Sequence, residues 1–278
     1  VGQGIYTILI QFAAEIFRCD PELVTIHAGD SSSTPESPLT AGSTATFSTG
    51  LALQEAANKL KEQLFGLSRE LLDIQYKDLD LRNFSIFSKV DPRQAMSIHQ
   101  MFSHLNITFL ETTVTSKPSS TTHIVNSFAA HFAQLDIDIS TGSIKLMRYV
   151  AVHDSGTIIN HNMAVNQVEG GVNQMLGLAL QEEVILDPKT GMTLNASFLE
   201  HKSFLINDYQ QVETEFVQTH DPVGPFGAKA LGEPPSVPVL AVIANALYDA
   251  TGIRFTKVPI TRENLLTRLT QIDKYEPI

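Results

Sequence analysis

The sequence predicts an α+β fold in which sheets are covered by helices. Three observations support this class. Several segments place apolar residues at helical spacing, others alternate apolar with polar residues, and the two kinds do not follow one another in strict βαβ order. The composition agrees, because 43% hydrophobic and 18% charged residues are typical of a chain that folds around a core.

The first part of the chain is predicted to be mainly helical. Apolar residues from Ile5 to Ile16 recur at helical spacing, and Asp20-Pro21 ends the pattern. The elements expected after it are a strand over 23–28, a loop over 29–42, a long amphipathic helix over about 43–64 and a short helix over about 68–73. Residues 78–122 carry weak signals and are expected to be irregular.

The second part mixes strands and helices. Leu135, Ile137 and Ile139 alternate with polar residues, which predicts a half-buried strand. Thr141-Gly142 is expected to turn this strand into a hairpin with residues 144–152. The expected helices cover 164–180, 237–251 with Gly252 as the stop, and a last segment capped by Thr261.

A polar, proline-containing stretch over residues 116–122 separates these two patterns and predicts a boundary. We therefore expect two domains, residues 1–122 and residues 123–278. The length of 278 residues suits either one large domain or two of ordinary size. The chain begins at Val1 with no initiator methionine and no signal peptide, which indicates a start inside a longer polypeptide.

The charge excludes several classes of partner. The net charge of −11 lacks the basic surface that nucleic acids and anionic membranes require. No apolar run approaches the roughly 20 residues that span a bilayer. Cys19 is the only cysteine, so the sequence predicts neither a disulfide nor a cysteine-rich metal or iron–sulfur site. The expected location is the reducing cytoplasm.

Two glycine-containing segments lie where helices are expected to begin. Gly2-Gln3-Gly4 would leave backbone N–H groups free for an anion, and the Gln3 amide could read the edge of a heterocycle. The alternative is an ordinary flexible terminus. In the second segment, which runs from Thr40 to Thr46, small residues allow a ligand to approach the backbone. The alternative is that Ser43 and Thr44 only cap the helix.

A pair of glycines interrupts the predicted helix over 164–180. Gly170 and Gly171 each cost about 1 kcal/mol relative to alanine within a helix. Either tight packing or a close ligand must offset this cost. Gln167 and Gln174 are seven residues apart and share one face of that helix.

The most distinctive segment is the glycine-rich loop 224–235, in which Glu233 stands between Gly232 and two prolines. A carboxylate at such a position is a solvated turn residue, a helix-capping carboxylate or a catalytic group, and the length of the pattern favours catalysis. Adjacent His153, Asp154 and Ser155 cannot form a serine-hydrolase relay among themselves, because neighbours on a strand point to opposite faces. The histidine spacing predicts no protein-held metal.

Together these segments resemble the molybdenum-binding subunit of the xanthine dehydrogenase and aldehyde oxidase family, the molybdenum hydroxylases. The resemblance rests on six segments in matching order: 2–4, 30–35 with 42–43, 136–142, 154–156 with 159–160, 167–171 and 227–235. It covers nearly all of the chain but only the C-terminal half of the family's subunit. It implies subdomains of the two-layer αβ type that bind molybdopterin.

The resemblance also implies roles for individual residues. Gly2 and Gln3 would hold the pterin of a molybdenum–pyranopterin cofactor, which bacterial members often carry as the cytosine dinucleotide. Its phosphate side would contact Ser43, Thr44 and Ala45, and Gly42 would place backbone beside the metal. Gln167 and Gly232 would contact the cofactor, and Glu233 would be the general base. No side chain of the protein would ligate molybdenum.

The implied activity is hydroxylation of an electron-poor carbon in an N-heterocycle or an aldehyde, with oxygen from water. The implied partners are the N-terminal half of the subunit and the domains or subunits that carry 2Fe-2S clusters and FAD. His161 and Met175 depart from the family pattern, where proline and glycine are usual. The family takes purines, nicotinate, aromatic aldehydes and carbon monoxide, and residues outside this chain choose among them.

Two alternatives belong to other classes. The chain could be a non-catalytic scaffold or assembly module that keeps the fold and docks redox partners. It could also be a hydrolase that uses Ser155 or Ser197, which a serine-directed phosphonate would label. Molybdenum content distinguishes the enzyme from the scaffold.

Overall fold

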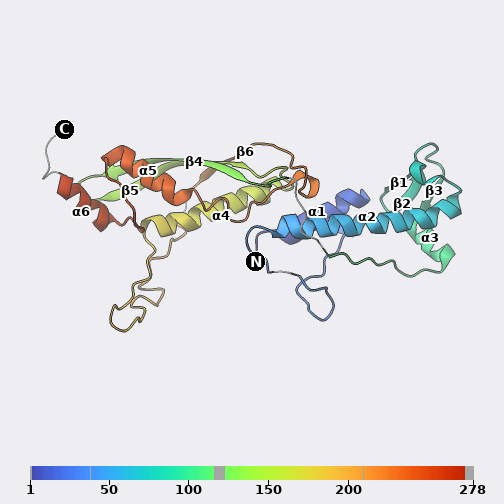
Figure 1. Cartoon of the computed structure of the whole chain (residues 1–278), viewed down its shortest axis with the longest axis horizontal. Coiled ribbons are helices and arrows are strands. Elements are labelled where there is room, and N and C mark those ends of the chain that lie inside the picture. The colour runs from blue at the N-terminus through green and yellow to red at the C-terminus, as the bar shows by residue number, and fades with distance from the viewer. Residues whose placement is uncertain (1, 38, 116–122, 209, 273–278) are drawn as a thin grey trace. The chain divides into compact units, whose positions relative to one another are not determined.

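The structure is a computed structural model that describes residues 2–37, 39–115, 123–208 and 210–272. The described residues form six α-helices and two three-stranded sheets, which confirms the α+β class (Figure 1). They divide into two compact units. The first unit comprises residues up to 125 together with 221–229, and the second comprises 126–220 together with 230–278. The predicted boundary at 116–122 lies outside the described residues.

The first unit combines helices with a small antiparallel sheet. Its elements are α1 (Ile5–Phe17), α2 (Ala45–Leu72), β1 (Leu79–Arg82), β2 (Ser85–Ser88), β3 (Ala95–Ser97), α3 (Ile98–Leu105) and the short 3₁₀ helices η1 (Pro21–Leu23), η2 (Tyr76–Asp78) and η3 (Pro225–Gly227). The sheet, α2 and α3 share a core that includes Leu64, Leu81, Ile86 and Met101.

The predicted helices over 43–64 and 68–73 are a single helix, α2, of 28 residues. The expected break lies beside Gly66, which costs only about 1 kcal/mol in a helix. Buried Leu64 and Phe65 offset this cost by packing on the sheet. The helix ends at Asp73, whose backbone adopts the left-handed conformation with φ of 50°.

Two predictions in this unit are wrong. Residues 23–28 form no strand within the described part of the chain, and Pro21–Leu23 is a 3₁₀ turn whose Glu22 amide donates to the Asp20 carboxylate. Residues 78–122 are not wholly irregular, because they contain β1, β2, β3 and α3. One signal was available: Ser97 and Gln100 form a capping box at the start of α3.

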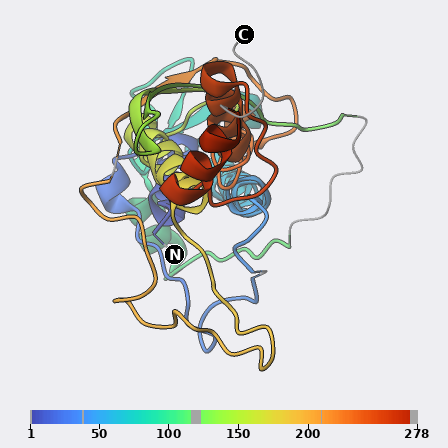
Figure 2. The same ribbon diagram turned by 90° about the vertical axis from the view of Figure 1, so that its left-hand side faces the viewer.

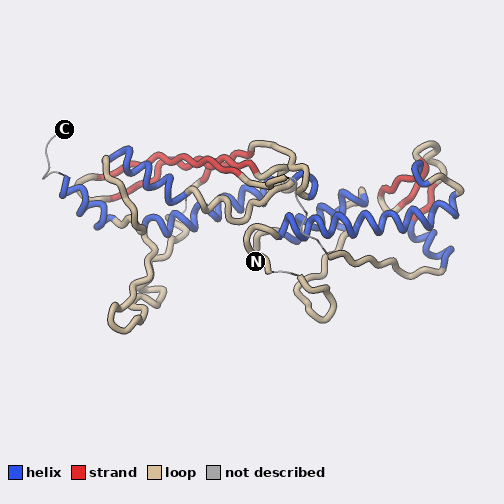
Figure 3. The backbone as a smooth tube through the Cα atoms, in the orientation of Figure 1, coloured by secondary structure: helices blue, strands red, loops and turns tan. Residues whose placement is uncertain are grey.

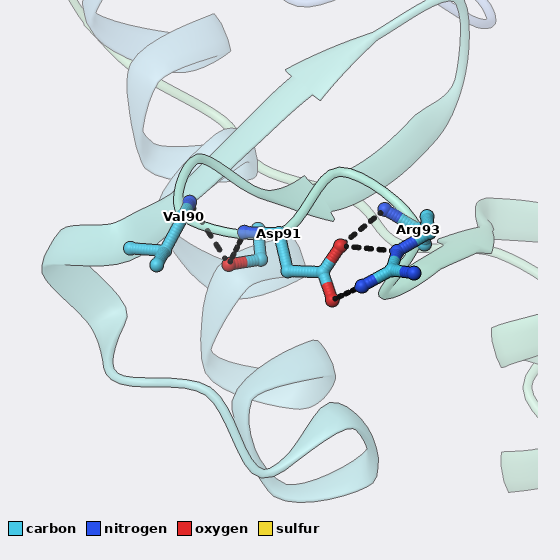
Figure 4. A network of polar contacts seen from close by, with 4 residues as sticks. Val90, Asp91 and Arg93 are labelled. Carbon is cyan, nitrogen blue, oxygen red and sulfur yellow. Dashed lines mark hydrogen bonds and ion pairs between the residues drawn. The ribbon is translucent and has the colours of Figure 1, made fainter.

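The turn between β2 and β3 is held by side chains (Figure 4). The hydroxyl of Ser88 accepts hydrogen bonds from the amides of Val90 and Asp91, each 3.2 Å long. The Asp91 carboxylate accepts from Arg93 Nε at 2.9 Å and Nη2 at 3.0 Å. This guanidinium lowers the pKa of Asp91. Short polar side chains therefore define this turn without glycine.

The second unit is built on a mixed sheet. Its elements are β4 (Phe128–Asp138), β5 (Ser143–Asp154), α4 (His161–Leu180), β6 (Val212–Phe216), α5 (Val239–Thr251) and α6 (Arg262–Ile272). Strands β4 and β5 are antiparallel, and β6 pairs with β5 in parallel. The predicted hairpin is confirmed, and Gly142 (φ 69°) donates to the carbonyl of Asp138 in its turn.

Helices α4 and α5 cover one face of this sheet, and α4 runs along its length (Figure 1). Tyr149 and Ala151 of β5 face Val172 of α4 and Ile243 of α5 in one buried cluster. The predicted cap of the last helix is confirmed, since the Asn264 amide donates to Thr261 Oγ1 at 3.2 Å. This layer of two helices on a sheet is the support for the loop that carries Glu233.

A long segment without regular helix or ladder connects α4 to β6 (Figure 3). Figures 1 and 2 both show it projecting from the helices and strands of the second unit. Its predicted turn is present, because the Gly191 amide donates to the carbonyl of Asp187 at 2.8 Å. Among the described helices, none has the length and apolar character needed to cross a bilayer.

Candidate functional site

The N-terminal segment leads into α1 through left-handed glycines. Gly2 and Gly4 have φ values of 95° and 84°, which side chains with a Cβ adopt at a cost. A Cβ at Gly2 would meet no atom within 4 Å, so space is open beside it. Within the described residues, no side chain caps the first turn of α1. The backbone here can therefore approach a ligand closely and offers N–H groups to it.

The amide of Gln3 lies in an unusual environment. Both Nε2 and Oε1 are buried and have no hydrogen-bond partner among the described residues. Buried polar groups are normally satisfied, and leaving one unpaired costs roughly 1–3 kcal/mol. A group that presents a donor and an acceptor side by side would satisfy this amide, as the edge of a pterin does.

The start of α2 provides the second segment. Gly42 and Ser43 have φ values of 63° and 57°, and the helix begins at Ala45. Thr44 stands at the N-cap, but its hydroxyl donates to the carbonyl of Ala41 at 3.0 Å and does not cap the helix. The Thr44 side chain thus makes no hydrogen bond to the first amides of α2. Uncapped amides at a helix start favour an anion.

In the second unit, α4 packs against the segment that follows the glycine-rich loop. The Gln167 side chain donates from Nε2 to the carbonyl of Gly232 at 2.7 Å. A Cβ at Gly171 would lie 2.9 Å from Pro235 Cβ and 3.2 Å from Ser236 Oγ. At Gly170 a Cβ would meet nothing within 4 Å. Of the two explanations for this glycine pair, tight packing therefore accounts for Gly171 and leaves Gly170 unexplained.

Glu233 has an exposed side chain on a backbone that is held on both sides. The carbonyl of Ala230 accepts from Ser127 Oγ at 2.5 Å, and that of Gly232 accepts from Gln167. The carbonyl of Glu233 itself accepts from the Ser236 amide at 2.9 Å. An ordinary solvated turn directs such carbonyls to water. This backbone is instead fixed while the carboxylate remains accessible.

The loop 224–235 is divided between the units. Its beginning, η3, belongs to the first unit, where Phe226 stacks on Phe12 with ring centroids 4.9 Å apart. From Ala230 onward the loop belongs to the second unit. The predicted site residues are therefore distributed over both units. The first unit carries Gly2, Gln3 and the segment Gly42–Ala45. In the second unit, the structure brings Gln167, Gly232 and Glu233 together.

A buried polar cluster in the second unit was not found from the sequence. His131 on β4 is hydrogen-bonded through Nδ1 to the hydroxyl of Tyr149 and through Nε2 to Nε2 of His153, each at 2.9 Å. Burial lowers the pKa of both histidines to about 4, and the neighbouring His153 adds to the effect on His131. The alternation of β4 and β5 could have indicated that these residues share the covered face.

Asp154, the middle residue of the His153–Ser155 run, holds a turn. Its carboxylate accepts from Thr219 Oγ1 at 2.5 Å and from the Gly156 amide at 3.1 Å. His153 and Ser155 are buried, as expected for alternate residues on one face of a strand. Their arrangement gives no support to a hydrolase.

The sequence model of the molybdopterin cofactor-binding domain matches residues 1–210. The xanthine dehydrogenase molybdenum-binding subunit of Escherichia coli O157:H7 is 32% identical over 277 residues, covering 95% of this chain and 36% of that protein. The aldehyde oxidoreductase molybdenum-binding subunit PaoC of E. coli K12 is 31% identical over 279 residues, covering 98% and 36%.

Solved structures agree. Reconstituted CO dehydrogenase from Oligotropha carboxidovorans superimposes with a TM-score of 0.86 at 27% identity, covering 99% of this chain and 35% of that one. Quinoline 2-oxidoreductase from Pseudomonas putida 86 has the same fold, with a TM-score of 0.85 at 23% identity. The chain therefore belongs to the molybdopterin cofactor-binding domain family of the molybdenum hydroxylases. It spans about a third of the length of these relatives.

Proposed function

We propose that this chain is the cofactor-binding and catalytic-base portion of a molybdenum hydroxylase. The reaction would hydroxylate an electron-poor carbon of an N-heterocycle or an aldehyde with oxygen derived from water. The observation that carries the proposal is the fixed backbone around Glu233. Its carboxylate is accessible while the carbonyls at positions 230, 232 and 233 are all hydrogen-bonded within the second unit.

The residues of the chain fit a molybdenum–pyranopterin cofactor. The buried, unsatisfied amide of Gln3 suits a pterin edge, and the start of α2 at Thr44 and Ala45, where the Thr44 side chain does not cap the helix, suits a phosphate. Left-handed Gly2 and Gly42 suit a close approach of backbone. When bound, the cofactor supplies the two-electron redox chemistry that side chains cannot perform.

Glu233 would act as the general base. A base must come within about 2.6–3.2 Å of the proton it accepts, directly or through one water, so its backbone has to be held in place. Gln167 contributes by donating to the carbonyl of Gly232, the residue before the base. The Pro234-Pro235 pair fixes φ immediately after it. The chain thus orients the carboxylate and receives the proton there.

The assembled enzyme would need partners. The proposed partners are the rest of the molybdenum-binding subunit and the domains or subunits that carry 2Fe-2S clusters and FAD. With Cys19 as its single cysteine, the chain cannot ligate such a cluster through four thiolates. The proposed location is the cytoplasm.

Replacement of Glu233 tests the proposal. In the assembled enzyme, Glu233→Gln should lower kcat about 10²- to 10⁴-fold, because general-base catalysis contributes this much. Molybdenum and pterin content should stay at the level of the unmodified enzyme. The matched control is Glu215→Gln, which changes an exposed glutamate on β6 and should leave kcat unchanged.

Two outcomes would contradict the proposal. Full activity of Glu233→Gln would remove the carboxylate from the reaction. A complete assembly that persistently lacks molybdenum would indicate the scaffold alternative, in which the chain keeps the fold and docks redox partners without catalysis.

A further inference from the structure

The backbone before Glu233 depends on hydrogen bonds from two separate elements. Gln167 comes from α4 and reaches the carbonyl of Gly232 at 2.7 Å. Ser127 lies immediately before β4 and reaches the carbonyl of Ala230 at 2.5 Å, across 103 residues of sequence. One donor belongs to the helix layer and the other to the edge of the sheet, so together they fix the segment 230–232 against both layers of the second unit.

The two sides of Glu233 differ in how strongly the chain itself restricts them. After Glu233, two prolines lock φ, and the Ser236 amide closes a turn on the carbonyl of Glu233 at 2.9 Å. Before Glu233 stands Gly232, the most permissive residue for backbone rotation. The backbone before Glu233 is therefore held mainly by the donors to the carbonyls of Ala230 and Gly232.

Of these two donors, Ser127 has no proposed contact with the cofactor, so holding the loop is its only proposed role. The proposed role of Gln167 includes contact with the cofactor, so its amide serves two purposes. Ser127 is half-buried, and its hydroxyl donates to a backbone carbonyl. A hydroxyl that donates to a half-buried carbonyl contributes about 1 kcal/mol to the stability of the folded state. This is too little to determine the fold but enough to select one loop conformation.

We propose that Ser127 is a positioning residue for the general base, acting through the backbone of Ala230–Glu233. The proposal rests on the proposed function of Glu233. Its hydroxyl keeps the loop in the one arrangement in which Gly232 reaches Gln167. Without it, Leu231 and Gly232 can rotate, and the carboxylate samples positions from which proton transfer fails.

The first test measures the loop and does not use activity. Hydrogen–deuterium exchange in the purified protein should be followed in the peptide that contains Leu231, Gly232 and Glu233, the backbone next to the carbonyl that Ser127 holds. In Ser127→Ala, exchange of the peptide that contains them should rise about 5- to 10-fold, the effect of losing one hydrogen bond. Ser127→Thr retains the hydroxyl and should restore protection. Unchanged exchange in Ser127→Ala would overturn the proposal.

The second test measures turnover in the assembled enzyme. Ser127→Ala should lower kcat about 10-fold with KM unchanged, because a slightly misplaced group loses much of its rate contribution. Ser127→Thr should recover most of kcat. The matched control is Ser140→Ala, which removes a hydroxyl that donates to Asp138 at the other end of β4 and should leave kcat unchanged.

The failures of the two proposals can be told apart. Increased exchange with unchanged kcat in Ser127→Ala would overturn the positioning role, provided that Glu233→Gln is inactive. Should Glu233→Gln retain full activity, the proposed function itself fails, whatever the Ser127 variants show. A fall in kcat for Ser127→Ala that Ser127→Thr does not reverse would also contradict the proposal.

Discussion

Two glutamines of the candidate site differ in the hydrogen bonds that their side-chain amides make. Gln3, in the first unit, has a buried amide with no partner among the described residues. Gln167, in the second unit, donates to the carbonyl of Gly232 at 2.7 Å. The proposed cofactor would supply the hydrogen-bond partner that the first amide lacks. The second already has a structural task, because it holds the loop before Glu233.

This difference indicates which part of the candidate site should be stabilised by a ligand. A group that binds only the folded state stabilises it, so the segment around Gln3 should gain most from binding. The segment around Gln167 and Glu233 is satisfied by contacts within the second unit and should keep its arrangement with or without a cofactor. The two units should therefore differ in their response to acid and to substitution.

Acid should destabilise the second unit. His131 and His153 are neutral in the folded state, because burial lowers the pKa of each to about 4. In the unfolded chain they take up protons near pH 6.5. The unfolded state therefore binds more protons between these values, and the free energy of unfolding falls as pH drops from about 6.5 towards 4. The loss for the two groups together should be on the order of 5 kcal/mol.

Hydrogen exchange of α4 and α2 at pH 7 and pH 4.5 would measure this effect separately in the two units. We expect α4 to lose protection at the lower pH while α2 changes less. Replacement of both histidines, as His131→Phe with His153→Leu, should reduce the pH dependence. Loss of protection in α2 before α4 would contradict the comparison.

The neighbouring glycines of α4 should respond in opposite directions. Gly171→Ala places a Cβ 2.9 Å from Pro235 Cβ and should destabilise the protein by about 1–3 kcal/mol. Gly170→Ala meets open space and should stabilise it by up to about 1 kcal/mol, since alanine favours the helix. Urea unfolding of the two variants measures both changes. Similar effects would show that Pro235 does not pack tightly on α4.

The smallest effect separates the two glutamines directly. In the cofactor-free protein, Gln3→Met should raise the free energy of unfolding by about 1 kcal/mol, because it removes a buried amide without a partner. Gln167→Met should lower it by about 1 kcal/mol, because the carbonyl of Gly232 loses its donor. Urea midpoints give both values. Destabilisation by Gln3→Met would mean that this amide is already satisfied.

Local patterns predicted much of the fold. The hairpin of β4 and β5, the start and end of α1 and the stop of α5 at Gly252 follow from alternation, spacing and capping residues. The alternation in Val212–Phe216 was a signal for strand β6, but five residues are too short a run to decide alone. Its place in the sheet depends on parallel pairing with β5. For the same reason the apolar run at 23–28 looked like a strand although it has no partner strand in the described structure.

The candidate site, like the fold, could be predicted only in part from the sequence. Gln167 and the glycine-rich loop are conspicuous in the sequence, and in the structure the Gln167 side chain donates to the carbonyl of Gly232. Ser127 could not be selected, because a serine before a strand is ordinary until its contact across 103 residues is known. The roles of Glu233 and of the residues near Gln3 stay predictions.

The packing of η3 has a consequence for dissecting this protein genetically. Pro225 and Phe226 lie against Gly50 and Phe12, so residues 221–229 complete the first unit although they are encoded far downstream. A gene fragment that stops at residue 122 would omit them and leave the aromatic ring of Phe12 uncovered. Neither unit corresponds to one continuous stretch of coding sequence. Chimaeras and truncations therefore need to retain this downstream insert to yield a well-packed product.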